Sequence, residues 1–509
     1  MHNKDIDQAL EFHQRTKHSP ESVRGSRHFL DWANQPLPFK IYRDLEARPL
    51  PAEIPSTGTP ALTAIASAGA ASSGEPPRLA QLAHLLYHSA GITRRRPYPG
   101  GEILFRAAAC TGALYQIELY LACGPLPDLP AGLYHFGPRD FALRRLREGD
   151  YRGLAAGAAG GDPSLDRAAA IVFSTGTYWR NAWKYQARAY RHFGWDSGTL
   201  HANLLAAAES WGWRPRLVCG FADDQINRLL DVDPGQEVAL AMVALGSGPP
   251  ALADSAAPPP LGFSTEPLSR HQVDYPAMHE VHAASSLHTT EEAAAWRQEP
   301  IETRPLPPPA EDLVPPAPLG DDQIPGDTIE AVIQRRGSSR GFHRRPIRLD
   351  QLSTLLDRST RGIPADFSPS AGTLNDLYLI VHAVEGLDPG AYVYRTAERS
   401  LERLKRGDFR RQAAYLALDQ DLAGDAAVAV FFLTDLERWL GRFGNRGYRA
   451  VQLEAGILGG KMYLAAYSQR LGATGLTFYD DEVVRFFSPH AAGKSAIFLV
   501  AIGHGRSNR

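Results

Sequence analysis

The sequence predicts an α+β protein in which two copies of one domain form an intramolecular pseudo-dimer. Three observations lead to this prediction: the two halves repeat one another, a proline-rich stretch separates them, and each half mixes strand-like with helix-like patterns. We expect the first domain at residues 1–248, a linker at 249–325 and the second domain at 326–509.

The repeat has a nearly constant offset. "LPAGLYHFGPRDFALRRLREGDYR" (129–152) matches "LDPGAYVYRTAERSLERLKRGDFR" (387–410), and Gly132 matches Gly390 at an offset of 390 − 132 = 258. The same offset relates "RAYRHFGWDSG" to "RGYRAVQLEAG", and "ALAMVALGSG" matches "AIFLVAIGHG" near the ends of the copies. Colinear matches indicate a duplication, and two joined copies can pack like the subunits of a two-fold dimer.

Each copy contains both kinds of element. The pairs "LYQIELYLACG" and "LNDLYLIVHAV", and "AAAIVFSTG" and "AAVAVFFLT", are apolar runs typical of strands. "TLHANLLAAAESWG" and "ILGGKMYLAAYSQRLG" have helical apolar spacing, and each ends at a glycine, as helices often do. Between the copies, residues 249–325 hold 16 of the 39 prolines, which predicts an extended linker.

Composition and charge exclude several classes of protein. The chain is 44% hydrophobic, enough for large buried cores, and its net charge of −2 provides no field that would attract nucleic acid or anionic lipid. The charged start and the short run "TPALTAIASAGAASSG" predict neither a signal peptide nor a membrane span. Cys110, Cys123 and Cys219 form no CxxC pair, so we expect a cytoplasmic protein in a reducing compartment, without nucleic-acid or membrane partners.

"RRGSSRGF" (335–342) is a candidate anion site at the end of the amphipathic stretch "DTIEAVIQRR". Arg336, Ser338 and Arg340 provide charge-assisted donors, and Gly337 lets the backbone approach an anion. A phosphate cradle is the functional interpretation of this pattern, and a solvated basic helix end is the structural alternative.

Together the motifs resemble the nitroreductase-like flavoprotein superfamily, and more narrowly its SagB/ThcOx-type dehydrogenase branch, as a tandem duplication in one chain. The resemblance rests on the arginine-serine cradle, "SPSAGTL", "PAGLYHF", "KYQARAYR", "LEAG" before a long helix, and "FADD" or "FYDD" after it. It implies two α/β sandwich domains that pair through long helices and bind FMN in clefts where the two domains meet.

The resemblance also implies which residues would hold FMN. The second copy would supply the phosphate cradle and further contacts: Arg336, Gly337, Ser338, Arg340, Gln420, Gly475 and Arg506. Ser370 belongs to the segment of the second copy that would reach across to the ring of the other flavin, in the place of "AACTG" in the first copy. The first copy would reach the flavin ring through "AACTG", with Cys110, Thr111 and Gly112. No metal site is predicted, because the "HEVH" of the linker lacks the spacing of a zincin helix.

Lys184 and Tyr185 are the candidate catalytic residues. They correspond to Arg442 and Phe443 in the second copy. Lysine and tyrosine can move a proton once burial shifts the pKa, whereas arginine stays protonated and phenylalanine has no proton to give. In the resembled branch a lysine-tyrosine pair assists dehydrogenation; the structural alternative is a surface lysine beside a packed tyrosine.

The two copies are expected to be unequal. The first copy offers only "VRGSRHF" (23–29) as a cradle, and Asp162 stands where the second copy has Gln420. One complete site would therefore combine the phosphate grip of the second copy with the ring contacts and the Lys184–Tyr185 pair of the first. The other site would be degenerate.

The expected function is an FMN-dependent oxidoreductase, with NAD(P)H as a candidate reductant and hydride exchanged with a small-molecule or modified-peptide substrate at the domain interface. The alternative is a flavin-free or inactive pseudo-dimer that acts as a binding partner in a modification complex. Colour of the purified protein separates the two. Substrate identity, the number of flavins per chain and further homo-oligomerisation stay open.

Overall fold

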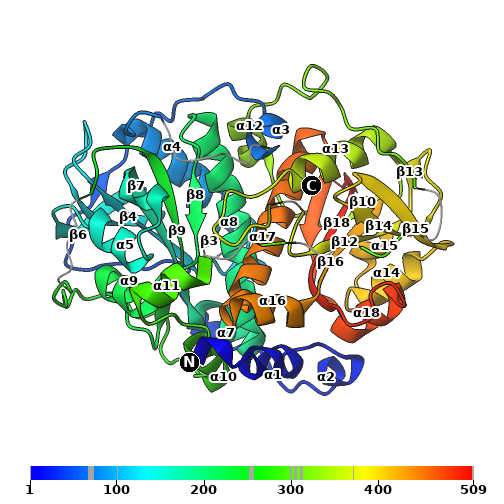
Figure 1. Cartoon of the computed structure of the whole chain (residues 1–509), viewed down its shortest axis with the longest axis horizontal. Helices are drawn as coiled ribbons and strands as arrows, with labels where there is room; N and C mark the ends of the chain where they lie inside the picture. Colours follow the sequence, from blue (N-terminus) through cyan, green and yellow to red (C-terminus); the bar gives the residue numbers. More distant parts are fainter. Residues whose placement is uncertain are drawn as a thin grey trace.

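The computed structural model places two similar domains side by side, with two long helices between them (Figure 1). These helices are α8 (Ala189–Ser210) from the first copy and α17 (Arg446–Ser468) from the second. The structure describes residues 2–66, 74–99, 101–251, 257–297, 301–302, 306–309, 313–370 and 372–506.

The first domain contains a seven-stranded sheet in the order β1-β6-β5-β4-β7-β9-β8, and every pairing in it is antiparallel. Its longest interior strand but one, β7, lies between β4 and β9 and is buried along its whole length, because helices cover both faces. The strands are β1 (Arg48–Pro49), β4 (Ile117–Cys123), β5 (Gly132–Gly137), β6 (Ala142–Glu148), β7 (Ala168–Thr177), β8 (Arg216–Val218) and β9 (Glu237–Ser247).

The second domain repeats this sheet in the order β10-β18-β16-β12-β14-β15, with β17 also paired to β18. The register is repeated as well, because Tyr120 faces Phe173 in the first sheet and Tyr378 faces Phe431 in the second. The strands are β10 (Phe342–His343), β12 (Asp376–Val381), β14 (Gly390–Arg395), β15 (Ser400–Arg406), β16 (Val428–Thr434), β17 (Gly472–Gly475) and β18 (Ser495–Gly505). Strands β11 (Ile347–Arg348) and β13 (Val384–Glu385) form a separate, short parallel sheet.

The shorter helices also occur in matching pairs that cover the sheets. On the outer face of the first sheet, an apolar cluster packs beneath α5, α6 and α9. No helix among the described residues is long and apolar enough to cross a membrane. The matching pairs are α5 (Arg152–Ala158) and α14 (Arg410–Leu416), α6 (Pro163–Asp166) and α15 (Asp421–Asp425), α7 (Tyr178–Tyr185) and α16 (Leu436–Phe443), and α9 (Asp223–Leu230) and α18 (Asp480–Phe487).

Helices α8 and α17 touch through glycines. A Cβ atom built on Gly198 would lie 2.5 Å from Gly456 Cα, and one built on Gly456 would lie 2.6 Å from the backbone oxygen of Gly194. The two backbones therefore approach more closely than any side chain would permit. This contact confirms the predicted intramolecular pseudo-dimer, and the repeated sheets confirm the predicted α+β fold.

The prediction of an extended linker across 249–325 is wrong for part of that range, and the domain boundaries stay a prediction. Residues 276–297 form α10 (Pro276–Ala284) and α11 (Thr290–Arg297), and Met278, Val281 and Trp296 are buried. The prolines of this range lie outside the two helices, except for Pro276, which occupies the first turn of α10, where proline is tolerated. The high proline content of the whole range predicts no helix, although two helical segments lie between its proline-rich stretches.

These helices are the counterparts of α1 (Asp7–Arg15) and α2 (Pro20–Arg24). His13 contacts the hydroxyl of Tyr448 on α17, and His282 contacts the hydroxyl of Tyr190 on α8. The backbone of His18 exchanges hydrogen bonds with Asp480, and the backbone of Leu287 exchanges the same two hydrogen bonds with Asp223. The repeat therefore includes the N-terminal arm, and α1 and α2 run beneath the second domain in Figure 1.

A single insertion explains why this part of the repeat escapes a sequence comparison at one offset. Helix α4 (Leu79–Ala90) precedes α13 (Leu349–Thr360) by 349 − 79 = 270 residues, whereas later elements differ by 258. The difference is the hairpin of β2 (Ile92–Tyr98) and β3 (Gly101–Arg106), which follows α4 and has no counterpart after α13 in the described residues.

Candidate functional site

The Lys184–Tyr185 pair lies at the end of α7, which stops because Gln186 adopts a positive φ of 51°. Both side chains are partly buried. Burial lowers the pKa of Lys184, and the positive charge of Arg340 lowers it further. Arg340 belongs to the second copy, so its charge acts on Lys184 across the domain interface.

Tyr185 lies against the "AACTG" loop. A Cβ atom built on Gly112 would lie 3.0 Å from the Tyr185 hydroxyl, and Gly112 itself has a φ of 66°, which favours glycine. Burial raises the pKa of Tyr185, and the charge of Asp196 raises it as well. Tyr185 therefore stays protonated and can donate a hydrogen bond.

Asp196 on α8 holds this loop in place. Its carboxylate accepts hydrogen bonds from the backbone N–H of Thr111 at 2.8 Å, from the Thr111 hydroxyl at 2.7 Å and from Gln116 Nε2 at 2.9 Å. The Cys110 thiol lies 3.1 Å from Asp196 Oδ2, the oxygen that also accepts from Gln116, and burial raises the pKa of that thiol well above its ordinary value. Cys110 is thus a neutral thiol, and Asp196 was missed by the sequence prediction because its partners lie about 80 residues away.

The predicted cradle follows α12 (Ile329–Arg335). Thr328 caps the start of this helix by accepting from Ala331 N, and Arg336 leaves the helical conformation just before Gly337. The Arg336 guanidinium is buried and donates to the backbone oxygen of Ala107 at 2.9 Å and of Arg106 at 3.2 Å, both in the first copy.

The other cradle residues surround Arg336. The Ser338 hydroxyl lies 3.3 Å from that of Tyr463, which also accepts from the backbone N–H of Gly475. Arg506 N donates to Gly341 O at 2.9 Å, and a Cβ atom built on Gly341 would lie 3.2 Å from Arg506 Cδ. The Tyr463 hydroxyl therefore links Ser338 to Gly475, and Arg506 lies beside Gly341 in the same segment as Ser338.

Most arginines of the predicted cradle lack a carboxylate partner among the described residues. Arg335 pairs with Asp327 at 2.5 Å. Among the described residues, no carboxylate forms an ion pair with Arg336, Arg340 or Arg506. Burial lowers the pKa of Arg336, since removing a guanidinium from water without an opposite charge is unfavourable. The buried Arg336, with the exposed Arg340 in the same segment, fits a phosphate group.

Two predicted residues lie apart from this group. The Gln420 side chain donates to Ala417 O at 2.7 Å within its own loop, and no described contact joins it to the cradle. Ser370 is exposed, and its backbone N–H donates to Ile301 O, next to the opposite pseudo-site. Ser370 therefore belongs with the Arg442–Phe443 side of the molecule.

That opposite position is filled by the chain itself. Trp296 of α11 packs on Phe443 with ring centroids 5.0 Å apart, and its Nε1 donates to Phe443 O at 2.9 Å. Arg297 donates to Gly220 O at 2.6 Å and lies 3.6 Å from Asp162. Phe443 and Asp162, the counterparts of Tyr185 and Gln420, therefore contact Trp296 and Arg297.

The first-copy cradle assigned to 23–29 is wrong. Helix α3 (Ala61–Ala66) is the counterpart of α12, because Ala61 N donates to Asp327 O and Ile329 N donates to Thr59 O in a symmetric pair. Residues 23–29 instead form the end of α2 and the segment after it, where His28 Nε2 contacts Trp183 O and Phe29 is 81% exposed. The sequence after α3, 67–73, lies outside the described residues and contains no arginine.

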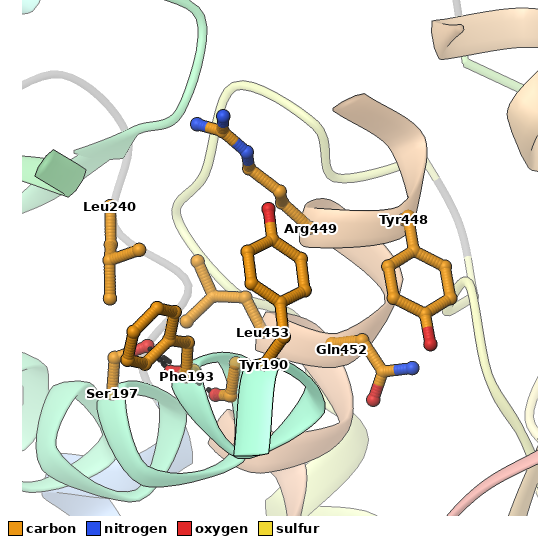
Figure 2. A pocket seen from close by; sticks show the side chains of 9 residues that line it. Tyr190, Phe193, Ser197, Leu240, Tyr448, Arg449, Gln452 and Leu453 are labelled. Carbon is orange, nitrogen blue, oxygen red and sulfur yellow. Dashed lines mark hydrogen bonds between the residues drawn. The ribbon is translucent and has the colours of Figure 1, made fainter. Parts of the chain in front are cut away.

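The pocket between α8 and α17 is a separate feature. Figure 2 shows side chains from both helices around it, among them Tyr190, Phe193 and Leu453. The cavity measures about 20 Å³, which is room for a water molecule and far too little for a flavin.

Comparisons with known proteins agree with this architecture. The sequence model of the Nitroreductase family matches residues 128–247 and 333–504, one segment in each copy and more than half of the chain. A solved structure from Anabaena variabilis, assigned to the nitroreductases, superposes with a TM-score of 0.76 at 28% identity and covers 98% of this chain and 99% of its own.

Two relatives match parts of the chain. MJ1384 of Methanocaldococcus jannaschii, assigned by name to the nitroreductases, is 30% identical over 163 residues, 30% of this chain and 81% of its own length. The microcin B17-processing protein McbC of Escherichia coli is 27% identical over 149 residues, 27% of this chain and 49% of its own length. With the family matched in both copies, the chain belongs to the nitroreductase family of oxidoreductases, as a tandem pair.

Proposed function

We propose that this protein is an FMN-dependent dehydrogenase with one flavin site, formed between the cradle of the second copy and the loop and α7 of the first. The observation that carries the proposal is that the buried Arg336 donates to Ala107 O across the domain interface with no carboxylate partner among the described residues, while the charge of Arg340 acts on Lys184 from the same segment. A phosphate at the arginines would direct the rest of the cofactor toward the Lys184–Tyr185 side.

The residues present suit FMN. Arg336, Arg340, Ser338 and Arg506 would hold the phosphate, and the backbone of Thr111 and Gly112 would lie at the ring. When bound, FMN supplies the group that exchanges hydride with a substrate carbon. The protein contributes orientation and proton transfer.

Lys184 is suited to accept a proton from the substrate. Its lowered pKa increases the fraction of neutral amine, which is the form that acts as a base. Tyr185, whose pKa is raised, keeps its proton and donates a hydrogen bond to the substrate atom that gains charge. Loss of hydride from a carbon is easier when a base takes a proton from the neighbouring heteroatom.

The substrate class we favour is a modified peptide or a small molecule with an oxidisable carbon next to a heteroatom. Similarity to a microcin-processing protein supports a peptide-derived substrate. Purification in the flavin-bound, yellow state would separate this proposal from a flavin-free binding partner. Reduction by NADPH and by NADH would identify the electron donor.

Replacing Arg336 and Arg340 together with alanine is expected to yield protein that purifies without flavin. Each charged hydrogen-bonding group contributes about 1.5–3 kcal/mol to binding. The measurement is the ratio of flavin absorbance to protein absorbance, with circular dichroism to check folding. Arg335→Ala is the control, because Arg335 is paired with Asp327 and donates to Tyr467 O. Full flavin retention in the double variant would show that the phosphate lies elsewhere.

Flavin content is expected to be close to one per chain. Trp296 and Arg297 occupy the opposite position, and the sequence after α3 carries no arginine. The measurement is flavin released by denaturation divided by protein determined from amino-acid analysis. A content near two would show that the second position opens and that its packing is not permanent.

A further inference from the structure

The β2–β3 hairpin is the largest difference between the two copies near the candidate site. It follows α4 and leads into the loop that carries Cys110 and Thr111, whereas the second copy reaches its corresponding loop without a hairpin. Its first strand carries three consecutive arginines, Arg94, Arg95 and Arg96, and is largely exposed. An exposed insertion with this charge beside a cofactor site calls for a functional explanation.

Arg94 and Arg95 have different surroundings. Arg95 Nη1 donates to Glu102 on the paired strand at 2.9 Å, so its charge is compensated within the hairpin. Arg94 extends toward the second copy, and its Nη1 lies 3.7 Å from the position of a Cβ atom on Gly337. Among the described residues, no carboxylate forms an ion pair with Arg94.

The approach of Arg94 to the cradle is electrostatically unfavourable in the absence of an anion. Its positive charge opposes that of the buried Arg336, whose guanidinium has only backbone oxygens as partners. An exposed arginine brought close to a buried one favours a shared counterion, and a phosphate dianion bound by two or more guanidinium groups removes the repulsion.

We propose that Arg94 is a phosphate-binding residue of the cofactor site, supplied by the hairpin of the first copy to the cradle of the second. The ligand group is a terminal phosphomonoester, here that of FMN, and this inference rests on the proposed function. The hairpin then closes the phosphate end of the site. Arg94 sets the preference for a phosphorylated flavin over riboflavin.

The test compares FMN with riboflavin, which has the same ring and no phosphate. Full-length apoprotein is titrated with each flavin, and binding is followed by quenching of flavin fluorescence. Arg94→Ala is expected to weaken FMN binding by about 10–100-fold, which is about 1.4–2.8 kcal/mol, and to leave riboflavin binding unchanged. Arg95→Ala, on the same strand, is the matched control and is expected to bind both flavins as the wild type does.

Two results would overturn the proposal: an unchanged FMN affinity in Arg94→Ala, or equal losses for FMN and riboflavin, which would mean that the hairpin acts on the ring. If wild-type protein binds neither flavin, the proposed function fails while the anion site is still tested by inorganic phosphate. Protection of the wild type against thermal unfolding by phosphate, lost in Arg94→Ala and kept in Arg95→Ala, would support the site. Equal protection of all three proteins would exclude it.

Discussion

Lys184→Ala and Tyr185→Phe, made separately, are each expected to lower substrate turnover by about 10²–10⁴-fold, the usual contribution of general acid–base help. Lys184 loses the amine that accepts the proton. Tyr185 loses the hydroxyl that lies against Gly112 on the loop proposed to face the ring. Neither residue is among the proposed phosphate contacts, so flavin content is expected to stay normal.

The measurement is steady-state turnover together with reduction of the bound flavin by dithionite, which needs no protein base. Arg442→Ala offers a control within the same chain, because Arg442 is the counterpart of Lys184 and lies over the ring of Phe443 in the filled position. Its turnover is expected to equal that of the wild type. Wild-type rates in both Lys184→Ala and Tyr185→Phe would make the pair structural and place the protein with simpler nitro- or quinone-reducing enzymes.

A single methyl group at the helix crossing is expected to separate the two copies. In Gly198→Ala the new Cβ atom would lie 2.5 Å from Gly456 Cα and 2.6 Å from Ile457 N, both backbone atoms that cannot rotate away. Overpacking costs about 1–3 kcal/mol where side chains can adjust, and we expect the upper end of this range or more here. Alanine has the higher helix propensity, so any loss of stability measures the clash.

Unfolding by urea and retention of flavin are the two readouts for Gly198→Ala and its partner Gly456→Ala. Gly441→Ala is the matched control, since Gly441 lies in α16 with no atom within 4 Å of its built Cβ position. It is expected to be neutral or slightly stabilising. Wild-type stability and flavin content in Gly198→Ala would mean that the two domains have room to move apart without losing the site.

Much of the architecture is predictable from sequence because it repeats. The match of Gly132 with Gly390 identifies the duplication, and the register of Tyr120 with Phe173 and of Tyr378 with Phe431 bears it out. The cradle is predictable because arginine, serine and glycine are adjacent in the chain. The Lys184–Tyr185 pair is visible through its contrast with Arg442 and Phe443.

Local sequence patterns predict much less about the segments that pack against both copies. Composition predicts a linker at 249–325, but α10 and α11 form there because Tyr190, Phe443 and Asp223 offer them partners from both domains. The motif at 23–29 has the composition of a cradle, yet α3 rather than α2 lies opposite α12. Residue type cannot distinguish these cases.

The duplicated α+β fold thus follows from the sequence alone, and the phosphate motif and the asymmetry between the copies are predictions from it, since each depends on residues close together or at a fixed offset. The relations between the copies are visible only in the folded chain: the charge of Arg340 acts on Lys184, Trp296 packs on Phe443, and Arg94 lies beside Gly337. These contacts depend on how α8 and α17 cross. They also depend on the β2–β3 hairpin, whose insertion changes the numbering offset between the two copies from 270 to 258 residues.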